Sequence, residues 1–382
     1  MLKKMVIIGP AWPLRGGLAT FDQRLAKQFI DEGHDCEIFS FSLQYPSFLF
    51  PGTTQFSSES APAGQKIRSI INSINPLNWI KVGRILKKLK PDIIIVRYWL
   101  PFMGPCLGSI IRITQKNNHT KAIAITDNVI PHEKRAGDFA FTKFFLNSCD
   151  AFITMSEKVM NDLRTFQPDL PAIQVRHPLY DNFGGAISKN VARLKLGIDP
   201  DKKIMLFFGF IRKYKGLDIL LEAMKILKER EVPSQIPHLL IAGEFYEDEQ
   251  PYLELISKLG IRELLILRTS FIQDSEVKYY LCAADVVIQP YRNATQSGVT
   301  PLAYHFEKPM VVTNVGNLPV MVPDHKTGLV AEPDPASIAS AITEYFQLGE
   351  NYFIPHLRSE KDKYGWNKMT EAILNLANDI QK

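Results

Sequence analysis

Residues 283–333 read AADVVIQPYRNATQSGVTPLAYHFEKPMVVTNVGNLPVMVPDHKTGLVAEP, and this stretch decides the fold. The apolar run at 285–289 predicts a buried strand, which a polar loop and a helix from about Val299 follow. A second apolar run at 310–313 predicts the next strand. Strand, helix and strand in this order are typical of an open parallel α/β sheet, whose ligand lies beyond the carboxyl ends of the strands. Because free amide N–H groups and the helix dipole point there, we expect an anion at this place.

Further pieces accompany this stretch in a recognisable order. They are Phe208-Gly-Phe-Ile-Arg212-Lys-Tyr-Lys215-Gly216, Gly243-Glu244, Asp285-Val-Val-Ile-Gln-Pro290, a helix ending at Lys308-Pro309, Val311-Val-Thr-Asn-Val-Gly-Asn317 and Lys326-Thr-Gly328-Leu-Val. Together they resemble the donor half of the family 4 glycosyltransferases, the glycosyl transferases group 1. The basic segment after Gly209 is similar to the donor loop of that family.

The resemblance implies an α/β protein of GT-B fold, in which two Rossmann-like doubly wound domains face each other across a cleft. It assigns residues 1–180 to an acceptor-side domain and residues 186–364 to a domain that binds the nucleotide-sugar donor. It also implies that a last helix, at about 365–382, packs back on the first domain. A chain of 382 residues with 46% hydrophobic content is long enough for two packed domains. Residues 177–185, with Pro and paired Gly, are expected to connect them as a hinge.

Composition excludes several classes of protein. No stretch approaches the roughly 20 consecutive apolar residues of a membrane-spanning helix, and the N-terminus lacks the pattern of a signal peptide. We therefore expect a cytoplasmic protein, at most peripheral at the inner face of the membrane. The net charge of +5 is mild and dispersed, which argues against a nucleic-acid partner. Basic clusters such as 84–90 leave contact with an anionic membrane or a phosphorylated substrate open. The four widely spaced cysteines indicate reduced, buried thiols.

The first predicted strand, from Met5, leads into the loop 10–17, which ends in Arg15, Gly16 and Gly17. Two glycines at a helix start let a ligand approach the backbone closely. The resemblance implies that this pair faces the donor diphosphate or the acceptor; a tight connection without ligand is the alternative. Residues 42–65 are long, aromatic and rich in turn formers, which indicates an irregular excursion used either for acceptor binding or for loop packing.

A second polar group follows the strand predicted at 121–126. The resembled family often has a histidine directly after this strand, and here Asp127 stands at that place while His132 follows five residues later. Because polar residues after a buried strand lie at the edge of the crevice, we expect Asp127 to be catalytic, although a plain turn is the alternative. The acceptor-side candidates are Arg15, Trp99, His132 and Glu133.

Transfer of a sugar leaves a nucleoside diphosphate, whose charge must be neutralised as the bond breaks. Arg212 and Lys215 follow a predicted strand and could hold the phosphates from one loop. The family usually has an arginine directly after the glycine, where this chain has Phe210, so we expect Arg212 to replace it. The close acidic pairs, in 199–201 and 247–249, read as exposed turns. We therefore expect a site without metal or other cofactor.

The donor pocket departs from the family at two positions. The family generally has two glutamates, for the sugar hydroxyls and the ribose, where alignment on Lys308-Pro309 puts Ala294 and Leu302. Hydroxyl, amide and backbone groups of 295–297 could still bind the sugar and phosphates. The predicted donor-binding residues are Gly16, Gly17, Gly209, Glu244, Gln296, Ser297, Gly298 and Val299. The missing pair indicates either a rearranged pocket or weakened catalysis.

The resemblance therefore predicts a glycosyltransferase that uses a UDP- or GDP-sugar, with retention of configuration. The acceptor would be a glycan, a lipid-linked or a small molecule, in polysaccharide or glycoconjugate biosynthesis. The alternative is a catalytically weakened nucleotide-sugar binding or scaffold protein of a polysaccharide assembly. A nicotinamide oxidoreductase is a distant third, because neither half offers the three-glycine fingerprint followed by an acidic residue.

Overall fold

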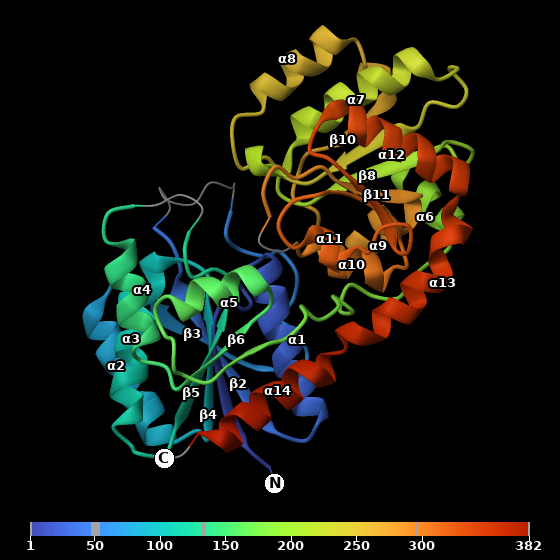
Figure 1. Ribbon diagram of the computed structural model, residues 1–382. Helices are drawn as coiled ribbons and strands as arrows, with labels where there is room; N and C mark the ends of the chain where they lie inside the picture. Colours follow the sequence, from blue (N-terminus) through green and yellow to red (C-terminus); the bar gives the residue numbers. More distant parts are fainter. Residues whose placement is uncertain (1, 47–53, 132–134, 295–296, 381–382) are drawn as a thin grey trace. The chain divides into compact units, whose positions relative to one another are not determined.

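The computed structural model describes residues 2–46, 54–131, 135–294 and 297–380 (Figure 1). The chain divides into two compact units. Unit 1 comprises Met1–Pro178 together with Gly365–Lys382, and unit 2 comprises Leu179–Tyr364. Each unit contains one parallel sheet with helices packed against it. The predicted α/β class, with two doubly wound sheets, is confirmed.

Unit 1 has a seven-stranded parallel sheet in the order β3-β2-β1-β4-β5-β6-β7. Its strands are β1 (Lys4–Ile8), β2 (Asp35–Leu43), β3 (Lys66–Asn72), β4 (Ile93–Tyr98), β5 (Lys121–Thr126), β6 (Ala151–Thr154) and β7 (Ala172–Gln174). The central strands are apolar along their length because helices cover both faces of a parallel sheet. The strand order reverses between β1 and β4, so their carboxyl ends flank the switch point where such sheets bind ligands.

The sheet of unit 1 is covered by six α-helices and a 3-10 turn among the described residues. They are α1 (Gly17–Asp31), α2 (Pro76–Leu89), the 3-10 turn η2 (Pro101–Met103), α3 (Gly104–Gln115), α4 (Asp138–Leu146), α5 (Glu157–Arg164) and α14 (Trp366–Asp379). Helix α14 comes from the far end of the chain and packs on α1, where Thr370 Oγ1 lies 2.7 Å from Glu32 Oε1. Its Trp366 ring stacks obliquely on Phe21, with the ring centroids 4.9 Å apart.

Unit 2 has a six-stranded parallel sheet in the order β10-β9-β8-β11-β12-β13. Its strands are β8 (Ile204–Phe208), β9 (His238–Ala242), β10 (Leu265–Arg268), β11 (Val286–Gln289), β12 (Met310–Thr313) and β13 (Gly328–Ala331). Its helices are α6 (Lys189–Leu196), α7 (Leu217–Arg230), α8 (Gln250–Leu259), α9 (Val277–Ala283), α10 (Val299–His305), α11 (Leu318–Met321), α12 (Pro335–Leu348) and α13 (Glu350–Lys361), with 3-10 turns η3 (Lys213–Lys215), η4 (Arg262–Leu264) and η5 (Asp362–Tyr364).

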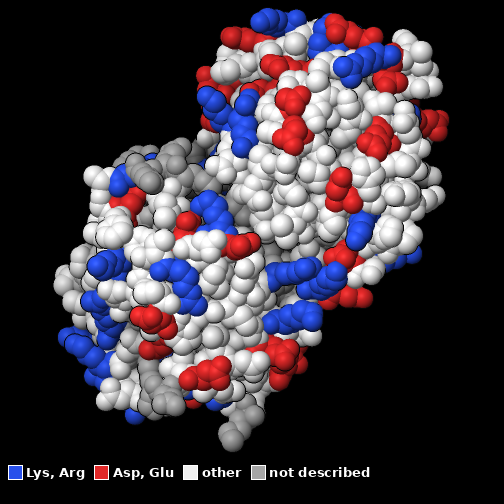
Figure 2. All heavy atoms as spheres, in the orientation of Figure 1, with Lys and Arg blue, Asp and Glu red and all other residues white. Residues whose placement is uncertain are grey.

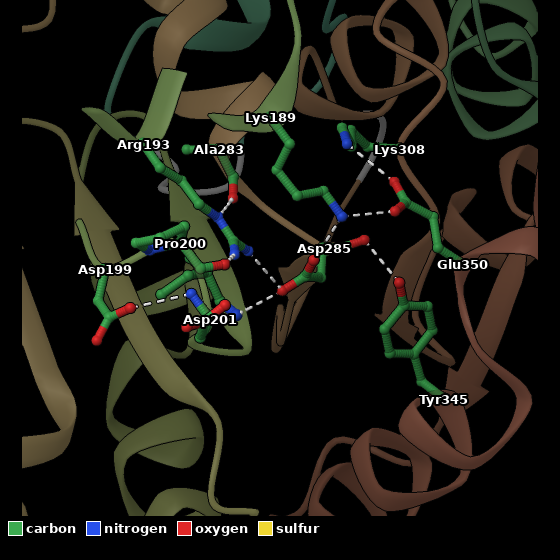
Figure 3. Close-up of polar contacts among 11 residues, drawn as sticks. Lys189, Arg193, Asp199, Pro200, Asp201, Ala283, Asp285, Lys308, Tyr345 and Glu350 are labelled. Carbon is green, nitrogen blue, oxygen red and sulfur yellow. Dashed lines mark hydrogen bonds and ion pairs between the residues drawn. The ribbon is translucent and has the colours of Figure 1, made fainter. Parts of the chain in front are cut away.

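Two motif residues of the stretch at 283–333 hold the amino ends of its strands (Figure 3). The Asp285 carboxylate accepts hydrogen bonds from Lys189 Nζ at 2.6 Å, Arg193 Nη2 at 2.9 Å and the Ile204 amide at 2.6 Å. Lys308 Nζ pairs with Glu350 Oε1 at 2.9 Å. Since ligands of such sheets bind at the opposite, carboxyl ends, Asp285 and Lys308 are structural residues that fasten α6 and α13 to the sheet.

The sequence did not predict the elements between residues 318 and 361, namely α11, β13, α12 and α13, nor β3 and α6. Strand β3 is an edge strand whose residues are mostly half-exposed, so its apolar signal is weak. Helix α6 is short, with a buried Arg193. Strand β4 runs through Tyr98 and includes Arg97, whose side chain is buried.

The four cysteines are free thiols, and all are buried, as the sequence predicts. Within the described part of the chain, no helix combines the length and the apolar character needed to cross a bilayer.

Candidate active site

The carboxyl ends of β8 and β11 lie side by side at the switch point of the unit 2 sheet. The loop 209–216 follows β8, and the loop that leads to α10 follows β11. The pairing of β8 with β9 continues past the strands, since the Ile211 amide donates to Glu244 O at 2.8 Å. Buried Glu244 is thus held beside the basic loop by its backbone.

Lys215 is the central side chain at the carboxyl ends of β8 and β11. It is only 8% exposed, and the described residues offer its ammonium no ion pair. Its Nζ lies 3.1 Å from the point where a Cβ would stand on Gly209, and the Val299 Cγ2 atom is 3.8 Å from that same point. The basic loop, Gly209 and the start of α10 therefore converge. Burial, helped by the nearby Arg212 cation, lowers the pKa of Lys215 to about 7.

Arg212 has a different environment. It is exposed, and its guanidinium carbon lies 5.1 Å from the centroid of the Tyr246 ring. A guanidinium resting on an aromatic face keeps its charge and its five donors. Arg212 can therefore turn to a bound anion, whereas Lys215 is preorganised.

Glycine is required where the backbones cross. Gly209 has φ +92°, and a Cβ on Gly243, at φ +141°, would overlap the carbonyl oxygen of Gly209. Only glycine permits so close an approach in these conformations. The Gly209 amide donates to Ala242 O at 2.9 Å, and the missing side chain of Gly209 leaves room for the Lys215 ammonium.

A buried hydrogen-bond cluster supports the start of α10. The hydroxyls of Ser297 and Thr300 both donate to Gln289 Oε1, at 2.6 and 3.0 Å. The Val299 amide donates to Ser297 Oγ at 3.2 Å, so one amide expected to face an anion has an internal acceptor. The Gln289 Nε2 atom is buried without a hydrogen-bond partner in the described structure. Gln289 was not predicted as a site residue, although a glutamine at the end of an apolar strand indicates a polar group at the edge of the sheet.

The positions expected to carry glutamates are apolar. Ala294 is 3% exposed and Leu302 is 4% exposed, and both pack into unit 2. The Ala294 carbonyl also lies against Gly316, which at φ +54° has no room for a Cβ. The pocket therefore has no carboxylate at either place. Of the predicted donor residues, Gln296 lies outside the described residues, as does its neighbour Thr295; Gly298 lies next to Tyr180.

Asp127 lies in unit 1 at the carboxyl end of β5, in a buried ion pair with Arg97. Arg97 Nε and Nη2 each donate to one Asp127 oxygen at 2.5 Å. The Arg97 guanidinium carbon also lies 3.8 Å from the Phe21 ring centroid. An arginine at the end of a buried strand could have signalled this partner, which the sequence analysis did not assign.

Two further titratable groups surround Arg97. Asp22 Oδ1 is 4.0 Å from Arg97 Nη1, and the buried Asp22 carboxyl forms no hydrogen bond among the described residues. Burial raises the pKa of Asp22 well above its ordinary value, although the Arg97 charge opposes this. Burial likewise lowers the pKa of His177 to about 4, so its ring is neutral at pH 7. This part of unit 1 therefore holds one firm ion pair, Arg97 with Asp127.

Two of the acceptor-side candidates, Arg15 and Trp99, form hydrogen bonds with the excursion at 42–65. Arg15 Nε donates to Thr54 O at 2.7 Å, and its amide donates to Gln55 O at 3.0 Å. Trp99 Nε1 donates to the Tyr45 hydroxyl at 2.5 Å. Gly16 has φ +103° directly before α1, which begins at Gly17. Residues 47–53, His132 and Glu133 lie outside the described residues.

Metal ligands do not gather in the part of the chain that the structure describes, where no three His, Cys, Asp or Glu side chains could share an ion. The acidic pairs at 199–201 and 247–249 are exposed. Asp199 accepts a hydrogen bond from the Asp201 amide at 3.0 Å, and Glu247 accepts one from the Tyr252 hydroxyl. Asp199 and Glu247 therefore form hydrogen bonds within the local segments to which they belong.

Comparisons with known proteins agree with this architecture. The model of the family described as Glycosyltransferase Family 4 matches residues 15–181, and that of Glycosyl transferases group 1 matches residues 202–347. The D-inositol 3-phosphate glycosyltransferase of Streptomyces avermitilis is 29% identical over 199 residues, which cover 50% of this chain and 42% of that protein. The chain spans about half the length of such curated relatives.

Solved structures share the fold over the whole chain. The sucrose-phosphate synthase of Thermosynechococcus elongatus superposes with a TM-score of 0.73 at 15% identity, covering 98% of both chains. Anabaena HepE in complex with UDP and glucose superposes with a TM-score of 0.72 at 14% identity, again covering 98% of both chains. With two family models matching successive halves and this shared fold, the chain belongs to the family 4 glycosyltransferases, the glycosyl transferases group 1, of GT-B fold.

Proposed function

We propose that this chain is a glycosyltransferase that moves a sugar from a UDP- or GDP-sugar to a glycan, lipid-linked or small-molecule acceptor. The transfer retains the anomeric configuration, needs no metal or other cofactor, and serves polysaccharide or glycoconjugate biosynthesis. The observation that carries the proposal is the buried Lys215 ammonium, which has no ion pair among the described residues and lies beside Gly209. Family membership and the UDP complex of Anabaena HepE support a nucleotide-sugar donor.

The proposed role of the basic loop is to stabilise the negative charge of the leaving diphosphate. As the bond between the sugar and the diphosphate lengthens, negative charge grows on the leaving phosphate oxygen. Lys215 offers a preorganised point charge in a place of low dielectric, where electrostatic stabilisation is strongest. Arg212 adds a forked donor from the exposed side of the same loop. We assign Gln289 Nε2, a buried donor for which the described residues offer no acceptor, to the donor ligand as well.

The remaining predicted residues keep their roles in this proposal. Asp127, fixed by Arg97, stands on the acceptor side as a polar group whose orientation is set. Arg15 and Trp99 act by holding the excursion at 42–65. His132, Glu133 and Gln296 stay assigned to acceptor and donor binding as the sequence predicts. We further propose a cytoplasmic protein that contacts the membrane peripherally and has no nucleic-acid partner.

The test is release of nucleoside diphosphate from a panel of UDP- and GDP-sugars, with and without acceptors. Lys215→Ala should lower the turnover on the order of a hundredfold or more, as loss of one preorganised donor does elsewhere. Lys213→Ala is the matched control, because Lys213 is an exposed lysine of the same turn. The proposal would be refuted if no sugar in a broad panel gave release of nucleoside diphosphate, or if Lys215→Ala and Lys213→Ala lowered the turnover equally.

A nucleotide-sugar binding or scaffold protein is the second candidate. The observation that favours it is the pair of buried apolar side chains, Ala294 and Leu302, where carboxylates are expected. Calorimetric binding of UDP or GDP without turnover of any sugar in the panel would select this function over the first.

A further inference from the structure

Lys215 differs from the other lysines that the structure describes. Among them only Lys215 and Lys308 are buried, with 8% and 7% of their surface exposed. Lys308 Nζ pairs with Glu350 Oε1 at 2.9 Å, whereas the described residues offer Lys215 no ion pair. The remaining lysines of the described ranges reach water, and Figure 2 shows lysine and arginine side chains at the surface, many of them near aspartate or glutamate. A buried lysine without a counter-ion among the described residues is therefore particular to this site.

The surroundings of Lys215 disfavour a positive charge on its nitrogen. The Nζ atom lies 5.7 Å from the centroid of the Tyr291 ring and close to Gly209. Burial raises the pKa of Tyr291, so its phenol is neutral and supplies no negative charge. Arg212, which precedes the same 3-10 turn, places a second positive charge nearby. The loss of water, the lack of a counter-ion among the described residues and the like charge all favour the neutral amine over the ammonium.

A neutral lysine amine is a nucleophile, whereas an ammonium is not. Burial beside another cation is one of the ways in which proteins activate a lysine for attack on a carbonyl carbon. An acyl phosphate combines such a carbon with a phosphate, and a site proposed to take a diphosphate admits this smaller anion. Arg212 is exposed on the same loop and can hold the phosphate, which leaves the Lys215 amine for the carbonyl carbon.

We propose that Lys215 is a site of covalent acylation by acyl phosphates, and that this modification switches off binding of the sugar donor. The Nζ atom attacks the carbonyl carbon, a C–N bond forms, and the bond from that carbon to the phosphate oxygen breaks. Phosphate leaves with the electron pair, and the proton released by the nitrogen goes to the phosphate or to water. The product is a neutral amide, so the charge that would hold the diphosphate is lost. The inference rests on the proposed function, because both need an anion bound beside Lys215.

The experiment is incubation of the full chain with acetyl phosphate, followed by digestion and tandem mass spectrometry of the modified peptides over time. Lys215 should be acetylated on the order of tenfold faster than Lys213 or Lys308, because its amine is the activated one. Lys213 is the control for position, since it is exposed in the same turn. Lys308 is the control for burial, since it is equally buried but ion-paired. Arg212→Gln should slow the reaction of Lys215 and leave that of Lys308 unchanged.

Calorimetry with UDP and GDP connects the modification to donor binding. After acetylation, the unchanged chain and Lys213→Arg should lose nucleotide affinity to the same extent, in proportion to the fraction of Lys215 that is modified. Equal rates at Lys213 and Lys215, or full nucleotide affinity after complete acetylation of Lys215, would overturn the inference.

The two proposals fail in different ways. If the chain turns over a sugar donor while Lys215 reacts no faster than Lys213, the acylation site is refuted and the proposed function stands. If Lys215 is acetylated selectively and loses nucleotide affinity, but no donor in the panel is turned over, the acylation site stands and the proposed transferase activity is refuted.

Discussion

At the scale of single residues, the charge state of Lys215 is the most informative quantity. Burial and Arg212 lower its pKa to about 7, so the ammonium loses its proton as the pH rises through neutrality. A bound diphosphate favours the charged form and would raise the pKa again. Anion binding at this place is therefore coupled to proton uptake above about pH 7.

This coupling predicts how nucleotide affinity depends on pH. The affinity for UDP or GDP should fall by up to about tenfold per pH unit above the pKa of Lys215, because the neutral amine must first be protonated. Calorimetry across a pH series measures this fall. Lys215→Gln should bind weakly and with a flatter profile, whereas Lys213→Gln should keep the slope. An unchanged chain whose affinity is constant from neutral to alkaline pH would contradict the assignment.

The Arg97 and Asp127 pair predicts a loss of stability that must not be mistaken for a loss of chemistry. Asp127→Asn should lower the free energy of unfolding by roughly 3–5 kcal/mol, because it leaves a buried guanidinium without its carboxylate. Urea denaturation followed by tryptophan fluorescence measures this directly. Turnover should be compared only under conditions where the variant is folded.

Two further variants make the interpretation specific. Arg97→Met/Asp127→Leu removes both charges and should cost less than Asp127→Asn alone. Asp162→Asn breaks only a surface pair with Lys158 and should cost under about 1 kcal/mol. An Asp127→Asn protein as stable as the unchanged chain would show that the pair contributes nothing.

At the scale of elements, α14 completes the core of unit 1 although it follows unit 2 in the chain. Trp366 is 4% exposed, packs on Phe21, and lies under the Arg24 guanidinium carbon at 5.1 Å. Lys121 Nζ also donates to Ala377 O at 2.5 Å. The helix is thus fastened to both α1 and β5.

Loss of the Trp366 side chain should therefore destabilise unit 1. Trp366→Ala should cost roughly 3–5 kcal/mol, as large-to-small changes of buried aromatic residues do. The other three tryptophans, at 12, 79 and 99, also belong to unit 1, so their fluorescence reports its unfolding. Lys368→Ala, an exposed change on the same helix, serves as the control. Equal midpoints for the two variants would mean that α14 is only loosely attached.

At the scale of the whole molecule, the chain consists of two parallel sheets, each with its own switch point. In unit 1 the switch point lies between β1 and β4, near Arg97 and the loop 10–17. In unit 2 it lies between β8 and β11, where Lys215 and Gln289 are found. Among the described residues, the cation at the switch point of unit 2, Lys215, is buried without an ion pair, whereas Arg97 at the switch point of unit 1 is paired with Asp127. This difference between the two cations is the reason why we propose that the donor binds to unit 2 and the acceptor to unit 1.

The fold class and most helices and strands could be predicted from the sequence, because apolar runs and periodicity are local signals. The order of the motifs around 208–216 and 283–333 also identified the family. The edge strand β3 escaped, since a half-exposed strand has little apolar contrast. The motif residues Asp285 and Lys308 could not be told from ligand-binding residues by spacing alone.

Only the tertiary structure decided which polar groups meet. The residues around Arg97 in the sequence do not show that it pairs with Asp127, thirty residues later. Nor does the sequence around Gln289 show that its side chain accepts hydrogen bonds from the hydroxyls of Ser297 and Thr300. The sequence also does not reveal that Lys215 is buried while Lys213, in the same turn, is exposed. Burial and pairing depend on distances between segments that are far apart along the chain, and those distances set the charge state of each group.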